Sequence, residues 1–115
     1  MSTKGSQLPR DALLQGTLDL LILRVLALGP HHGHGIAMAI HARSDQTLLV
    51  EHGSLYPALQ RLEEKGWVES DWRVTEQNRR AKYYELTAAG RRALGVEAKQ
   101  WKQYVAMVDI VLRTT

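Results

Sequence analysis

The sequence predicts a mainly α-helical fold with a two-stranded β-wing and a long C-terminal helix, and three observations lead to it. Three segments with a helical spacing of apolar residues come first, and two short segments with alternating apolar residues follow them. A polar turn joins the two alternating segments, which is typical of a β-hairpin. One long helical segment completes the chain. This order is that of a winged helix-turn-helix domain.

The composition indicates one small cytoplasmic domain. The chain has 115 residues and no cysteine, which excludes a disulfide-stapled secreted scaffold, a thiolate zinc site and cysteine catalysis. Its longest apolar stretch, residues 18–28, is interrupted by Asp19 and Arg24 and is too short to cross a bilayer. Residues 1–6 lack the apolar core of a signal peptide. We therefore expect a cytoplasmic protein with no membrane partner.

The first helix follows an arm rich in Ser, Thr, Lys and Gly. Residues 1–10 are predicted to form this flexible arm. From about Pro9 to Leu28, apolar residues recur at spacings of four and three, which predicts a helix. Pro9 suits a first-turn position, where a missing N–H is tolerated. Gly29-Pro30 is expected to end the helix.

Two further helices are expected before the wing. Residues 31–35 read as a short connection, residues 34–43 as the second helix and residues 44–50 as an extended or loop segment. The third helix is predicted over residues 52–65, with Gly66 as its C-terminal stop. Its inward stripe, at spacings of three and four, consists of Leu55, Ala58, Leu59 and Leu62.

The hairpin begins directly after the third helix. Residues 67–74 alternate between apolar and polar side chains, residues 75–78 form a turn, and residues 79–86 form the returning strand. Trp67 and Trp72 are expected to close the apolar space beneath this wing.

The last helix predicts a homodimer. Thr87 is a plausible N-cap, and the helix extends to about Leu112. Its apolar residues follow an alternating spacing of four and three, which is a heptad seam. Because a helix of about 25 residues spans roughly 37 Å, longer than a domain of this size, one protomer cannot cover the seam; folding back over its own core is the alternative. The predicted interface consists of Leu18, Leu94, Ala98, Trp101, Tyr104, Val105, Val108, Val111 and Leu112.

The third helix also carries groups that can read DNA. On its outer side lie Ser54, Tyr56, Gln60 and Arg61. Arg61 suits a guanine edge and Gln60 an adenine edge, and either suits a phosphate equally well. An ordinary solvated helix face is the alternative interpretation.

Positive charge is concentrated in residues 72–92, which span the outer part of the hairpin and the start of the last helix. Residues 72–92 carry six Lys or Arg against two Glu, whereas the rest of the chain carries nine basic and ten acidic side chains. Such a local excess attracts a polyanion such as the DNA backbone. A charged edge strand that prevents aggregation is the alternative, and the two roles can coexist. The candidate phosphate ligands are Arg73, Arg79, Arg80 and Lys82.

Catalytic and metal-binding patterns are weak. His31, His32 and His34 have no second ligand pair at metal spacing. The segment 53–55 matches only half of a nucleophile elbow, and no glycine-rich phosphate loop is present. We therefore expect no enzyme, no metal and no cofactor.

Four segments together resemble PadR-type transcriptional regulators. They are residues 14–23 (LQGTLDLLIL), 32–36 (HGHGI), 53–63 (GSLYPALQRLE) and 82–87 (KYYELT), with Gly90 after them. The resemblance covers residues 13–112 and is to the short, single-domain subfamily. Two positions depart from the family pattern: His34 stands where tyrosine is usual, and Gly35 stands where an acidic residue is common.

The resemblance implies a winged-helix dimer on double-stranded DNA that usually acts as a repressor. It places Ser54, Tyr56 and Pro57 at the start of the recognition helix. Some relatives release DNA when a small aromatic effector binds between the protomers, and Trp101 on the seam could stack such a ligand; a plain interface anchor is the alternative. We expect a DNA-binding domain at residues 11–86 and a dimerisation helix at residues 87–115.

The rival function is a protein–protein adaptor, with Glu63, Glu64, Glu69 and Asp71 as partner contacts. The full set of predicted DNA contacts is Gln15, His34, Ser54, Tyr56, Pro57, Gln60, Arg61, Arg73, Arg79, Arg80 and Lys82.

Overall fold

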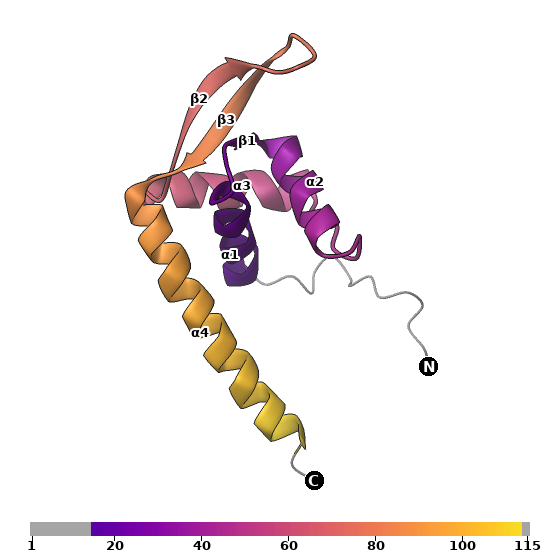
Figure 1. The fold of residues 1–115 in the computed structure, drawn as a ribbon, viewed down its shortest axis with the longest axis vertical. Coiled ribbons are helices and arrows are strands. Elements are labelled where there is room, and N and C mark those ends of the chain that lie inside the picture. Colours follow the sequence, from indigo (N-terminus) through magenta and orange to yellow (C-terminus); the bar gives the residue numbers. More distant parts are fainter. Residues whose placement is uncertain (1–14, 114–115) are drawn as a thin grey trace.

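The computed structural model describes residues 15–113, apart from the Gln15 side chain. The predicted arm at residues 1–10 and the first-turn position of Pro9 lie outside this range. In chain order the elements are α1 (Gln15–Leu26), β1 (His31–His32), α2 (Gly33–Arg43), α3 (His52–Glu64), β2 (Val68–Val74), β3 (Arg80–Leu86) and α4 (Ala88–Arg113). Figure 1 shows the β2–β3 wing at one end of the long axis and the free end of α4 at the other.

The predicted winged helix-turn-helix fold is confirmed, with one addition to the sheet. His31 and His32, expected in a connection, form the short strand β1, which pairs antiparallel with β3 in the order β1-β3-β2. His31 lies opposite Tyr84 in this ladder. The wing is therefore tied to the start of α2 by backbone hydrogen bonds as well as to the core.

The core lies where α1, α2 and α3 meet the base of the wing. The predicted inward stripe of α3 is buried, as are the inward residues of α1 and α2. Each fully buried Leu or Ile contributes about 1.5–3 kcal/mol, so the three helices and the wing base form one unit. The largest fully buried side chains are Ile22, Leu23, Leu26, Ile36, Leu55, Leu59, Leu62 and Val68.

Side-chain caps set where two helices begin. His32 caps α2, because its Nδ1 accepts a hydrogen bond from the Gly35 amide at 3.0 Å. Thr87 caps α4 as predicted: its Oγ1 accepts from the Gly90 amide at 3.0 Å and also donates to the Gly66 carbonyl at 2.7 Å. Thr87 therefore joins the end of β3 to the turn after α3.

The start of α4 is packed tightly against the wing base. A Cβ atom at Gly90 would lie 2.9 Å from both the Trp67 carbonyl carbon and Leu86 Cδ1. Farther along, the 26-residue helix leaves the body of the protomer. At 1.5 Å per residue it is about 39 Å long, which exceeds the 33 Å intermediate dimension of the molecule.

Candidate nucleic-acid interface

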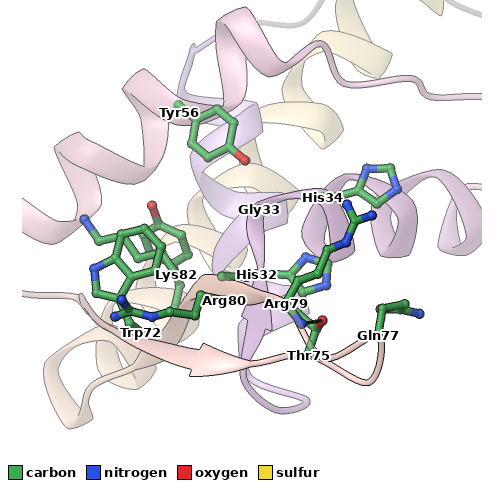
Figure 2. Close-up of a pocket in the computed structure, with 12 residues that line it drawn as sticks. His32, Gly33, His34, Tyr56, Trp72, Thr75, Gln77, Arg79, Arg80 and Lys82 are labelled. Atoms are coloured by element: carbon green, nitrogen blue, oxygen red, sulfur yellow. Dashed lines mark hydrogen bonds between the residues drawn. The ribbon is translucent and has the colours of Figure 1, made fainter.

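An open groove lies between the inner face of the wing and the N-terminal ends of α2 and α3. Its volume is about 610 Å³. Figure 2 shows Trp72, Arg80 and Lys82 together on one side of the groove and Tyr56 on the other. Arg79 and His34 also line it. None of the described residues that line the groove is Asp or Glu, so a polyanion meets only neutral and basic side chains there.

The outer side of α3 is available to a ligand. Ser54, Tyr56, Pro57 and Gln60 are all exposed, as predicted for residues that face a partner. The Gln60 amide lies 3.4 Å from Glu64 of the same helix, a long contact between exposed groups. A hydroxyl, a phenol and an amide thus remain on one solvent-facing side of α3.

Arg61 does not share this side. Its guanidinium contacts the Asp19 carboxylate of α1 at 3.0 Å, and the side chains are 31% and 12% exposed respectively. In this structure the Arg61 guanidinium is thus engaged within the chain, and its contact with a guanine edge stays a prediction.

Tyr56 is held against the start of α2. Its hydroxyl points toward Gly33 in Figure 2. A Cβ atom at Gly33 would lie 2.7 Å from Cζ and 2.8 Å from Cε1 of Tyr56, closer than carbon atoms can approach. The glycine therefore makes the space in which the Tyr56 ring lies, with its hydroxyl at the groove.

A chain of aromatic rings crosses the α2 and α3 starts. The His34 and His52 ring centres are 6.0 Å apart, and those of His52 and Tyr56 are 5.7 Å apart. His34 is exposed at the first turn of α2, where it can donate a hydrogen bond to a phosphate.

Within residues 15–113 there is no group of three or more His, Cys, Asp or Glu that could hold a metal ion.

The β2–β3 register sorts the wing residues onto two faces. Trp72 pairs with Lys82 and Val74 pairs with Arg80, so these four side chains share the inner face that borders the groove. The Arg80 guanidinium lies 5.2 Å from the centre of the Trp72 ring. Arg79 is exposed at the end of the turn, where its backbone carbonyl accepts a 2.7 Å bond from the Thr75 amide.

Arg73 belongs to the opposite face. It donates to Asp71 at 2.9 Å and to Glu85 at 3.1 Å. The hydrogen bond to Asp71 raises the pKa of the Arg73 guanidinium, and the Glu85 carboxylate adds to this effect. Arg73, predicted as a phosphate ligand, is therefore engaged with two carboxylates on the face that turns away from the groove.

The two tryptophans beside the wing differ. Trp67 is half-buried against the core, with the Lys65 ammonium 4.6 Å from its ring centre. Trp72, expected to close the apolar space beneath the wing, is instead 59% exposed. The alternating pattern of β2 indicates its face correctly, but the wing extends beyond the core at that point.

A second candidate surface is the apolar side of α4. Leu94 and Val105 are half-buried, whereas Leu112 near the end of the helix is 74% exposed. Trp101 lines a groove of about 540 Å³ between α4 and α1. Leu18, predicted at the dimer interface, is 3% exposed and belongs to the core of its own protomer, so it offers almost no surface to a partner.

This arrangement of α3, wing and α4 is shared with known regulators. The family model described as "Transcriptional regulator PadR-like family" matches residues 22–96. The chain belongs to the PadR-like family. It is a transcriptional regulator of that family rather than an enzyme, and the resemblance seen in the sequence is confirmed.

Solved structures agree with the family. A transcriptional regulator from Clostridium thermocellum is 26% identical to this PadR-like chain, with a TM-score of 0.76 over 86% of this chain and 95% of that one. A PadR family transcription regulator from Clostridium difficile is 28% identical, with a TM-score of 0.71 over 83% and 97% of the two chains. Among curated proteins, uncharacterized protein X of Lysinibacillus sphaericus is 27% identical over 90% of this chain and 94% of its own length.

Among the helices within residues 15–113 of this PadR-like chain, none combines the length and the apolar character that a bilayer crossing needs.

Proposed function

We propose that this PadR-like regulator is a cytoplasmic, sequence-specific DNA-binding protein that represses transcription as a homodimer on a pseudo-palindromic operator. The observation that carries the proposal is the shared groove: Tyr56, on the exposed side of α3, and the basic residues on the inner face of the wing border one open space. A duplex that receives α3 in its major groove meets the wing on the adjacent backbone.

Two groups of residues divide the contacts. Ser54, Tyr56, Pro57 and Gln60 lie on the exposed side of α3 and are proposed to face base edges. Arg79, Arg80 and Lys82 line the groove and are proposed to hold phosphates, with His34 as a further donor. Gln15 is also proposed as a DNA contact, on the sequence alone, because its side chain lies outside the described part of the chain.

The dimer rests on α4. We propose residues 11–86 as the DNA-binding domain and residues 87–115 as the dimerisation helix. The apolar seam of α4 extends past the body of the protomer, so a second copy covers it best. Two-fold symmetry then presents two α3 helices to half-sites about one helical turn, roughly 34 Å, apart.

A small aromatic effector is proposed to relieve repression at Trp101. The ring is part of the groove between α4 and α1, where a flat ligand could stack on it. This groove adjoins the seam that we assign to the partner, so a ligand there would alter how the two protomers meet.

The adaptor alternative has less support. Two of the four carboxylates on which it depends are engaged within the chain: Glu63 accepts from Ser70 at 2.6 Å, and Asp71 pairs with Arg73.

Replacing Arg79 and Arg80 together by Ala should weaken binding to every duplex. Selection of bound DNA from a random pool first supplies the operator, and a titration at several salt concentrations then measures the effect. The slope of log K against log salt should become shallower by about 0.9 for each phosphate that the variant no longer neutralises. The double variant Arg91→Ala/Arg92→Ala is the matched control, because it removes the same charge from exposed positions on α4. If both double variants show the same slope of log K against log salt, the wing does not contact the DNA.

Replacing Gly33 by Ala should lower operator affinity about tenfold, the value of one base-edge contact. The new Cβ displaces the Tyr56 ring, whereas α2 itself gains helix propensity. In a Tyr56→Ala background the same substitution should have no further effect, because the ring is gone. A full tenfold loss in that background would show that Gly33 acts independently of Tyr56.

A further inference from the structure

The inner face of the wing carries an apolar surface that the protomer leaves uncovered. Trp72 is 59% and Val74 62% exposed, although Val68 on the same face of β2 is 2% exposed. The face changes from core to solvent along one strand because β2 and β3 extend past the helices. Trp72 and Val74 thus form a contiguous exposed apolar patch, and such a patch with a polar rim is typical of an interaction site.

Cations surround this apolar surface. Lys82 is the cross-strand partner of Trp72, and the Arg80 guanidinium lies over the indole ring at 5.2 Å. Stacking on the ring restricts the rotamers of Arg80 and aims its planar donors at the groove. The inner wing thus presents an apolar plate between two positive charges.

Trp72 lines the same groove as Tyr56 and His34. A ligand that covers Trp72 would therefore also contact the starts of α2 and α3. A DNA strand matches the pattern, since the apolar C–H faces of its deoxyribose rings alternate with phosphates. A protein partner would need an apolar patch flanked by carboxylates and would compete with DNA for the groove.

We propose that Trp72 is a DNA-contacting residue: its ring packs on a deoxyribose of the operator strand whose neighbouring phosphates are held by Arg80 and Lys82. The proposal rests on the proposed DNA-binding function and deepens it. Trp72 then adds affinity by excluding water from the sugar, whereas the two cations add affinity by releasing counterions. The two contributions differ in their salt dependence, which makes them separable.

The test is a set of titrations of the operator duplex with the full-length protein, Trp72→Ala, Trp72→Phe and Arg80→Ala, each at four salt concentrations. Trp72→Ala should lose about tenfold in affinity at every salt concentration, the effect of one apolar contact, with an unchanged slope. Arg80→Ala should instead show a slope shallower by about 0.9. Trp72→Phe, which keeps an aromatic plate, should retain most of the affinity. Because the side chain is exposed, none of the three variants should change the thermal midpoint.

Tryptophan fluorescence gives a second readout. Operator DNA should quench the emission of the unmodified protein, and Trp72→Phe should bind the duplex without that change. If Trp72→Ala shows the shallow slope of Arg80→Ala, the ring acts only by positioning Arg80 and the proposed contact is wrong. Unchanged affinity in Trp72→Ala would also overturn it. If the unmodified protein selects and binds no duplex, the proposed function itself fails.

Discussion

Replacing Val105 and Val108 together by Glu should convert the proposed dimer to monomers and weaken operator binding by about 10²-fold or more. Both residues lie on the predicted seam of α4, and two buried carboxylates there would face their own copies across the two-fold axis. A monomer engages one half-site at a time, so it loses the effective concentration that links the two. Sedimentation velocity measures the assembly state, and a titration of the operator measures the affinity.

The control places the same charges elsewhere on α4. Gln103 and Ala106 are exposed and lie on the other side of the helix from the seam. Gln103→Glu/Ala106→Glu should remain dimeric and bind the operator with a small electrostatic loss. Dimers in the Val105→Glu/Val108→Glu variant would show that the protomers meet through another surface.

Replacing Arg61 by Met destabilises the fold by about 2–3 kcal/mol. The substitution leaves the Asp19 carboxylate, whose side chain is 12% exposed, without its cation. Breaking a fully buried pair costs about 3–5 kcal/mol, and the partial exposure of Arg61 reduces that value. Urea denaturation followed by circular dichroism measures the free energy of unfolding.

Two further variants separate the ion pair from a DNA contact. Arg61→Lys keeps the charge and should keep most of the stability, whereas Asp19→Leu/Arg61→Met removes both charges and should recover most of the stability. Normal stability of Arg61→Met combined with weaker operator binding would support the prediction that Arg61 reads a base.

Local periodicity explains why the helices and the hairpin could be predicted. The stripe of α3 and the alternation of β2 each record which side of an element is apolar, and burial follows that side directly. Thr87 could be identified as a cap because its bond partner lies only three residues away. Arg61 and Asp19 are 42 positions apart, and no local pattern relates them. The same limit applies to Arg73, whose partner Glu85 is set by the register of the hairpin.

Two other features depend on three-dimensional placement. The strand β1 has two residues, too few to show alternation, and it exists only because β3 offers an edge beside it. His52 does not stand out in the sequence, yet its ring lies between those of His34 and Tyr56, two residues that line the groove. The exposure of Trp72 depends on how far the wing extends past the helices, a distance that composition and spacing do not encode.

The junction of β3 and α4 joins the wing directly to the long helix. Leu86 ends the strand and Ala88 begins the helix, with Thr87 bonded to both sides and Gly90 pressed against the Trp67 backbone. A single residue separates the two elements, so we expect α4 to work as a lever arm: a tilt at its far end would reach the wing base and, through it, the helices to which the wing is bonded. The crossing angle of two such levers would then tune how well a pair of wings fits the pitch of a duplex.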